Sequence, residues 1–194
     1  MERTGRVVIL NGASSAGKTT LATAFRDQRA TVGDFWLLTG IDDFLKKLPS
    51  EWRSVGHDRG ASATDGVRFE TAPDGLQVRV GSVGRQVLRA YQMAVGAAAR
   101  VGLNVIVDDV VIDKTHLDDW NSSVAGLDVD WVGIRCAPDV AEGRERSRGD
   151  NRYSGLSRAQ TEIVHRDARY DFEIDTTTQT PAQELSALTR QLGY

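Results

Sequence analysis

The chain has 194 residues, of which 40% are hydrophobic and 26% charged, and this composition excludes collagen-like, low-complexity and coiled-coil proteins. Its 24 Lys and Arg residues against 27 Asp and Glu residues give a net charge of −3, which argues against a surface built to neutralise nucleic-acid phosphates. The longest apolar runs fall short of the roughly 20 residues that span a bilayer. The single cysteine, Cys136, and the short apolar run near the N-terminus lead us to expect a cytoplasmic protein with neither a nucleic-acid nor a membrane partner.

Short apolar runs alternate with helix-like segments, a pattern typical of a parallel sheet with crossover helices. Runs of strand length occur at residues 7–10, 35–38, 105–107, 131–134 and 172–174. Four of them are almost continuously apolar, as expected for strands that helices cover on both faces. Helices are predicted at residues 19–29, 42–48, 84–100, 138–148 and from residue 181 onward. The sequence therefore predicts a single α/β domain over residues 1–194, with about five parallel strands flanked by helices in three layers.

A polar, glycine-containing stretch interrupts this alternation between about residues 49 and 82. It ends in two strand-like runs, residues 67–70 and 76–80, which the turn sequence Pro73-Asp74-Gly75 separates. This arrangement predicts a β-hairpin. Because an insertion of this length inside a βα unit is usually functional or mobile, we expect it to select the substrate.

Residues 12–19 match the phosphate-binding pattern G-x-x-x-x-G-K-[ST]. The pattern directly follows an apolar strand and opens an amphipathic helix, so backbone N–H groups and the positive helix end converge on phosphate oxygens. It predicts an ATP site in which Lys18 reaches the β- and γ-phosphates and Thr19 holds Mg²⁺. The residues expected to bind the nucleotide are Gly12, Ala13, Ser14, Ser15, Ala16, Gly17, Lys18, Thr19 and Thr20.

The rest of the chain narrows the class of phosphate-loop protein. It contains no Asn-Lys-x-Asp guanine signature and leaves no room for the second domain of a motor or ring ATPase, so a small P-loop kinase remains. Such a kinase needs an acidic residue at the end of an apolar strand as a second magnesium ligand. Asp108 directly ends the run 105–107 and is preferred over Asp109; the alternative is that both carboxylates only cap the strand.

Phosphoryl transfer to a hydroxyl needs a carboxylate near the carboxyl ends of the strands. Asp42 and Asp43 follow the second predicted strand and are the candidates for this general base. The alternative is that one of them only caps the helix over residues 42–48.

Arginines are concentrated between residues 142 and 158, where five of them accompany three acidic residues in a chain of negative net charge. We expect a lid over about residues 143–158 that closes on the phosphates and excludes water. Arg144 and Arg148 lie four residues apart and are the candidates for stabilising charge on the transferred group. The alternative is a solvated helix face on which Glu142 pairs with Arg146.

In combination, these segments resemble the chloramphenicol phosphotransferase family of P-loop kinases. The resemblance runs over most of the chain and is carried by residues 9–12, 14–18, 40–42, 106–110, 131–136, 140–145, 148–150, 164–165, 170–171 and 175–177. It implies ATP-dependent phosphorylation of a primary hydroxyl on a small antibiotic, with Asp42 rather than Asp43 as general base. It also implies that the loop containing Asp175 and Thr177 lies beside the adenine.

The acceptor is the part of the prediction that stays open. Residues 52–80, which are expected to contact the acceptor, match the family only loosely. Chloramphenicol or a related secondary metabolite is the leading interpretation. The alternatives are a kinase of a housekeeping metabolite, such as a nucleoside, sugar acid or sugar nucleotide, and an ATP-binding switch protein without transfer activity. A homo-oligomer is compatible with all three.

Overall fold

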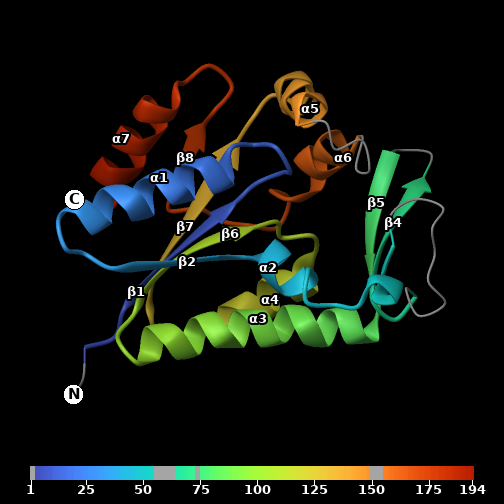
Figure 1. Cartoon of the computed structure of the whole chain (residues 1–194), viewed down its shortest axis with the longest axis horizontal. Coiled ribbons are helices and arrows are strands. Elements are labelled where there is room, and N and C mark those ends of the chain that lie inside the picture. Colours follow the sequence, from blue (N-terminus) through green and yellow to red (C-terminus); the bar gives the residue numbers. More distant parts are fainter. Residues whose placement is uncertain (1–2, 55–63, 73–74, 149–154) are drawn as a thin grey trace.

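The main sheet contains five parallel strands in the order β2-β6-β1-β7-β8 (Figure 1). The structure is a computed structural model that describes residues 3–54, 64–72, 75–148 and 155–194. The strands of this sheet are β1 (Arg6–Asn11), β2 (Trp36–Gly40), β6 (Asn104–Asp109), β7 (Asp128–Arg135) and β8 (Phe172–Asp175). The predicted α/β class and the five parallel strands are confirmed.

Helices cover both faces of the sheet and give three layers (Figure 1). Alternate residues of β1 face opposite sides: Val8 and Leu10 belong to one buried cluster, and Val7 and Ile9 belong to the other. The first cluster packs under α1 and α7, and the second packs under α3 and α4. These helices are α1 (Lys18–Thr31), α3 (Ser82–Arg100), α4 (Lys114–Ser123) and α7 (Pro181–Gln191).

Two helices were not predicted from the sequence. The first, α4, is largely polar, yet it buries Trp120 completely and begins after Asp113, whose side chain accepts a hydrogen bond from His116 N at 2.9 Å. The second is α6 (Leu156–Ile163), which follows α5 (Pro138–Ser147) in the predicted lid region. The helix predicted over 42–48 is shorter than expected, because α2 (Ile41–Leu45) ends three residues earlier.

The insertion forms a small sheet of its own in the order β3-β4-β5. Its strands are β3 (Arg53–Ser54), β4 (Val67–Ala72) and β5 (Gly75–Val80). The last two pair antiparallel from Val67 opposite Val80 to Ala72 opposite Gly75, so the predicted hairpin is confirmed. Its turn residues, Pro73 and Asp74, lie outside the described residues.

Within the described ranges, no helix combines the length and the apolar character that crossing a membrane requires.

Candidate active site

The candidate site is a cleft of about 760 Å³ at the carboxyl ends of the central strands. The phosphate loop, α2, the hairpin β4–β5, the segment after β6 and α6 all contribute to its walls. Parallel pairing brings Asp108 of β6 opposite Leu10 of β1 on one side and opposite Gly40 of β2 on the other. The sheet therefore places the Asp108 carboxylate between the phosphate loop that follows β1 and the acidic turn that follows β2.

The backbone of the phosphate loop requires glycine at two positions. A Cβ atom on Gly12 would lie 2.5 Å from the carbonyl oxygen of Ile134, and Gly17 has φ of +97° at the N-cap of α1. Ser15 between them also has a left-handed φ of 61°. Its buried hydroxyl has no hydrogen-bond partner among the described residues. A curved loop with an unsatisfied buried donor fits a phosphate group.

Lys18 and Thr19, at the start of α1, meet Asp108 of β6. The Thr19 hydroxyl donates to Asp108 Oδ2, and Lys18 Nζ lies 3.6 Å from Asp108 Oδ1. The Lys18 side chain is buried, and its ammonium group donates to the carbonyl oxygen of Ala13 at 2.8 Å. A hydroxyl and one carboxylate beside a phosphate loop are the protein ligands that fit Mg²⁺, which keeps its remaining positions for phosphate oxygens and water.

Asp109 has a different environment from Asp108. Its side chain is fully buried and accepts hydrogen bonds from Trp120 Nε1 and from the backbone N–H of Val110. It does not line the cleft, whereas Asp108 does. Of the two carboxylates that the sequence left as candidates, only Asp108 can therefore face a metal ion bound at the phosphate loop.

Asp42 and Asp43 also differ in what they contact. Asp43 Oδ2 accepts a hydrogen bond from the backbone N–H of Gly40 at 3.0 Å, which makes it the carboxylate of a capping box at the start of α2. Asp42 lines the cleft, and its carboxylate has no hydrogen-bond partner among the residues that the structure describes. Although its side chain is accessible to solvent, desolvation by the surrounding protein raises the pKa of Asp42. The carboxylates of Asp108 and Asp43 raise it further, while Lys46 and Lys18 oppose them.

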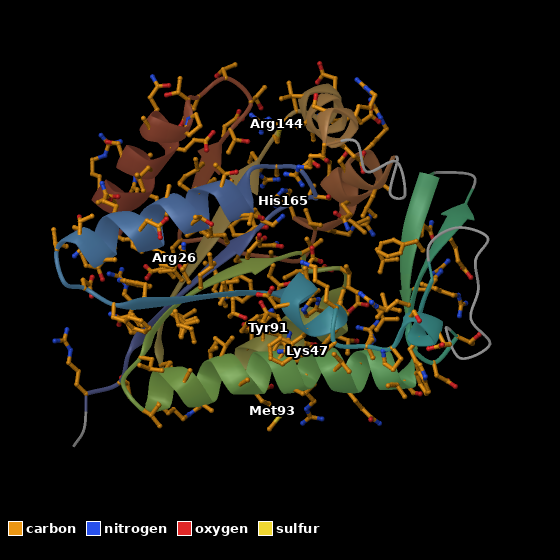
Figure 2. The ribbon with its side chains drawn as sticks, viewed as in Figure 1. Arg26, Lys47, Tyr91, Met93, Arg144 and His165 are labelled. Atoms are coloured by element: carbon orange, nitrogen blue, oxygen red, sulfur yellow. The ribbon has the colours of Figure 1, made fainter. Side chains whose placement is uncertain are left out.

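The arginines of the predicted lid divide into three groups. Arg144, which Figure 2 labels, lies on α5. It is held against the loop after β8, because its guanidinium donates to the carbonyl oxygen of Thr176 at 2.7 Å and to the Thr176 hydroxyl at 3.1 Å. Arg148 lines the cleft and has no ion-pair partner within the described part of the chain. Arg146 approaches Glu142 at 4.0 Å, which is the pair that the solvated-face alternative predicted, and Arg158 pairs with the same carboxylate at 2.5 Å. Arg152 lies outside the described residues.

We expect the two candidate arginines to respond differently to truncation. Arg148→Ala removes an exposed charge at the cleft, so kcat should fall by about 10- to 10²-fold with an unchanged melting temperature. Arg144→Ala removes hydrogen bonds to Thr176 and should lower stability by about 1–3 kcal/mol and weaken ATP binding. Steady-state kinetics and thermal unfolding measure both. Arg146→Ala, on the same helix, is the control and should change neither; equal effects of all three would contradict this division.

The loop predicted to lie beside the adenine is shaped by its own hydrogen bonds. Asp175 Oδ1 accepts from the backbone N–H of Thr177 at 2.8 Å, and the Thr177 hydroxyl accepts from Ala137 N at 2.9 Å. Thr176 between them donates to the carbonyl oxygen of Ala16 in the phosphate loop at 2.8 Å. The loop therefore lies against the outer side of the phosphate loop, and its contact with adenine stays a prediction.

A buried network behind the phosphate loop was not predicted from the sequence. Asn11 Nδ2 donates to the Tyr170 hydroxyl at 2.7 Å and to the carbonyl oxygen of Val164 at 2.8 Å. The Tyr170 hydroxyl also lies 2.6 Å from His165 Nδ1, and in the tautomer that carries its proton on Nε2 the His165 ring accepts the hydroxyl proton. Desolvation, with Arg135 nearby, lowers the pKa of His165 to about 4, and desolvation raises the pKa of Tyr170 to about 12. His165 is therefore a neutral acceptor that fixes the end of α6.

This network predicts a pH dependence of stability. The folded-state pKa of His165, about 4, lies below its ordinary value of about 6.5, so the unfolded chain binds a proton that the folded chain does not. The free energy of unfolding should therefore fall as the pH is lowered from about 6.5 towards 4. His165→Asn keeps an acceptor near the Nδ1 position without titrating, so its stability should decline less steeply. Urea unfolding of both proteins across this range measures the difference, and identical slopes would contradict the prediction.

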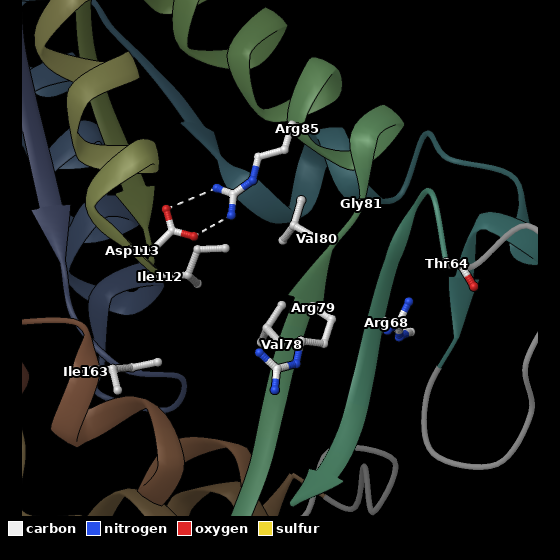
Figure 3. A pocket seen from close by; sticks show the side chains of 10 residues that line it. All are labelled: Thr64, Arg68, Val78, Arg79, Val80, Gly81, Arg85, Ile112, Asp113 and Ile163. Atoms are coloured by element: carbon white, nitrogen blue, oxygen red, sulfur yellow. Dashed lines mark hydrogen bonds and ion pairs between the residues drawn. The ribbon is translucent and has the colours of Figure 1, made fainter.

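A second pocket, of about 400 Å³, lies between β5, the start of α3 and the segment before α4 (Figure 3). Both terminal nitrogens of Arg85 donate to the Asp113 carboxylate, Nη1 at 3.0 Å. Desolvation raises the pKa of Asp113, but the hydrogen bonds from Arg85 and from the backbone of His116 outweigh it and lower this pKa. Arg68 and Arg79 both pair with Glu70, at 2.6 Å and 3.3 Å. All three arginines therefore have carboxylate partners, and we interpret this pocket as a structural junction.

Comparison with known proteins identifies the chain. A family model described as "Chloramphenicol phosphotransferase-like protein" matches residues 5–192. The chain belongs to this family. One curated relative is a protein of Mycobacterium tuberculosis that is named "Putative O-phosphotransferase Rv2636". The two sequences are 37% identical over 185 residues, which cover 94% of this chain and 79% of the relative.

Two solved structures with the same fold are named as kinases. One is a sugar kinase from Janibacter sp., with a TM-score of 0.66, 19% identity and coverage of 97% of this chain and 94% of that one. Another is the Mycobacterium tuberculosis APS kinase CysC in complex with AMPPNP and APS, with a TM-score of 0.67, 15% identity and coverage of 98% and 99%. The predicted family and P-loop kinase fold are confirmed, and this family member is a phosphotransferase.

Proposed function

We propose that the protein is an ATP-dependent O-phosphotransferase that phosphorylates a hydroxyl of an antibiotic such as chloramphenicol, or of a related secondary metabolite. The observation that carries the proposal is the position of Asp42. Its carboxylate lines the same cleft as Lys18, Thr19 and Asp108, without a partner of its own among the described residues. One cleft thus offers a phosphate-binding loop and, across from it, an unengaged base.

In the proposed reaction, the amides and the Lys18 ammonium of the phosphate loop hold the β- and γ-phosphates of ATP. Thr19 and Asp108 would hold Mg²⁺, which neutralises charge on the phosphates when bound. Asp42 accepts the proton of the acceptor hydroxyl, and the raised pKa of Asp42 makes it a stronger base than an ordinary aspartate. Arg148, at the rim, stabilises charge on the equatorial oxygens of the transferred phosphoryl group.

The walls of the acceptor side support a largely apolar acceptor body. Hydrophobic side chains from α2, the hairpin, α3 and the segment after β6 line this part of the cleft: Ile41, Leu45, Val67, Phe69, Val78, Val80, Leu88, Val110 and Ile112. These side chains outnumber the polar ones that line the same part of the cleft, Lys46, Ser50 and Arg53, and such a wall suits an aromatic or aliphatic body that carries a hydroxyl. A polyhydroxylated sugar would leave many of its hydroxyls without partners against such a wall.

The test is incubation of the purified protein with Mg-ATP and single candidate acceptors, followed by mass spectrometry for a phosphoryl increment. The panel contains chloramphenicol, other antibiotics with a primary hydroxyl, and a matched set of nucleosides, sugar acids and sugar nucleotides. We expect product with the first group and none with the second. Product only with the housekeeping metabolites would overturn the proposed acceptor class and leave the phosphotransferase assignment intact.

A further inference from the structure

The side chain of Gln160 reaches from α6 to the phosphate loop. Its Oε1 accepts a hydrogen bond from the backbone N–H of Ser14 at 2.7 Å, across 146 residues of sequence. The residue is 5% exposed and lines the cleft, as does Leu156 one helical turn earlier. Gln160 therefore lies where the phosphate loop meets the lid and the acceptor walls.

The orientation of the Gln160 carboxamide follows from its partner. A backbone N–H can only donate, so the atom that faces Ser14 must be the carbonyl oxygen of the side chain. The amino group, Nε2, is then the other end of a planar group whose position is fixed. Within the described part of the chain, Nε2 has no hydrogen-bond partner, although the side chain is almost entirely buried. A donor without a partner, on a nearly buried side chain that lines the cleft beside a phosphate loop, is available for a ligand oxygen.

Both ends of α6 are tied to neighbouring elements, which holds Gln160 in place. At the start, the Ser157 hydroxyl and the backbone N–H of Gly155 donate to Glu145 of α5 at 2.9 Å and 3.2 Å. Just past the end, the carbonyl oxygen of Val164 accepts the buried hydrogen bond from Asn11 of β1 at 2.8 Å. The donor needs little reorganisation when charge develops near it, and such preorganisation is what makes a hydrogen bond effective in a transition state.

From these contacts we infer that Gln160 is a catalytic residue of phosphoryl transfer, whose Nε2 donates to an equatorial oxygen of the phosphoryl group in the transition state. In that step the bond between the γ-phosphorus and the β–γ bridging oxygen breaks, and the bond to the acceptor oxygen forms. ADP leaves, the acceptor proton passes to Asp42, and Gln160 transfers no proton. The Ser14 amide holds the Gln160 carbonyl and so aims the donor. The inference rests on phosphotransferase activity and is independent of which acceptor is used.

Gln160→Ala and Gln160→Glu separate a donor from a structural anchor. The glutamate variant keeps an oxygen that can accept from Ser14 N–H, but it has no amide donor. The two probes are Mg-AMPPNP, which resembles bound ATP, and Mg-ADP with aluminium fluoride, which resembles the transferred group, and calorimetry gives their dissociation constants. We expect Gln160→Ala to bind AMPPNP within about 3-fold of the wild type and to bind the aluminium fluoride complex at least about 10-fold more weakly.

The two variants together decide the role. A donor predicts that Gln160→Glu binds the aluminium fluoride complex at least as poorly as Gln160→Ala. A structural anchor predicts that Gln160→Glu resembles the wild type with both probes, or that Gln160→Ala weakens both probes equally, and either result overturns the inference. Thr161→Ala, on the same helix, loses only its hydroxyl bond to the Ser157 carbonyl and should leave both constants unchanged. If the antibiotic panel fails while this binding pattern holds, the acceptor class is wrong and the role of Gln160 stands.

Discussion

Lys18→Ala lowers phosphoryl transfer by at least about 10³-fold and leaves the fold intact, as we expect from the position of its ammonium group. Lys18 Nζ lies at the mouth of the phosphate loop, bonded to the carbonyl oxygen of Ala13 and 3.6 Å from Asp108. Its removal leaves the Asp108 carboxylate without that nearby cation and the phosphates without their point charge. Turnover with the true acceptor and circular dichroism of the variant measure the two parts of the prediction.

Two further lysine variants make this experiment specific. Lys18→Met keeps an aliphatic stem in the buried position, so a loss of activity in both variants is due to the charge and not to a cavity. Lys114→Ala removes an exposed lysine that pairs with Asp118 on α4, far from the phosphate loop in sequence, and should retain full activity. Wild-type turnover in Lys18→Ala would show that the phosphate-loop interpretation is wrong.

Asp42→Asn should lower kcat by about 10²–10⁴-fold while ATP affinity stays nearly unchanged. The substitution keeps the shape of the side chain and removes the base. It should not destabilise the protein, because a carboxyl whose pKa is raised in the folded state opposes folding once the pH exceeds that pKa. Measurements of kcat, ATP dissociation constant and melting temperature separate the three effects.

The pH profile gives an independent check on Asp42. If Asp42 is the base, kcat/KM of the wild type falls as the pH drops through the pKa of Asp42, which lies above that of an ordinary aspartate. Asp42→Asn should lose this limb of the profile. Asp43→Asn is the matched control, since an asparagine oxygen can still accept from Gly40 N, and it should keep this limb of the profile. The limb should move to lower pH, because the Asp43 charge no longer raises the pKa of Asp42. A silent Asp42→Asn would refute the mechanism.

The elements with a local signal were predictable from the sequence. The strands are visible because helices on both faces make them continuously apolar, as in residues 7–10, and the hairpin is visible because Pro73-Asp74-Gly75 separates two strand-like runs. The helix α4 was missed because most of its residues are polar. Its sequence signals are weak: the capping residue Asp113 and the apolar Trp120, which is buried.

The candidate site residues could be predicted from the phosphate-loop motif and from their positions at strand ends. Contacts between residues far apart in the sequence could not be predicted. The phosphate loop, Asp42 and Asp43 follow strands of one sheet, and Asp108 and Asp109 end β6 of the same sheet, so topology brings them to one edge. In each pair one aspartate is engaged by another part of the chain: Asp43 accepts from Gly40 N, and Asp109 accepts from Trp120 Nε1. No spacing rule encodes those partners. Gln160 was missed for the same reason, because its partner Ser14 lies on a different element.

The separation of the two sheets has a consequence for how such an enzyme can change. The hairpin sheet β3-β4-β5 shares no strand pairing with the five-stranded sheet that carries the phosphate loop, Asp108 and the turn with Asp42. Substitutions at Phe69 or Val78 should reshape the proposed acceptor wall without moving the strand ends that we propose to bind phosphate and accept the proton. We therefore expect selectivity and chemistry to be separable in this fold: replacing the strands β4 and β5 should redirect the proposed enzyme to another alcohol, provided that the contacts of β5 with α6 are kept.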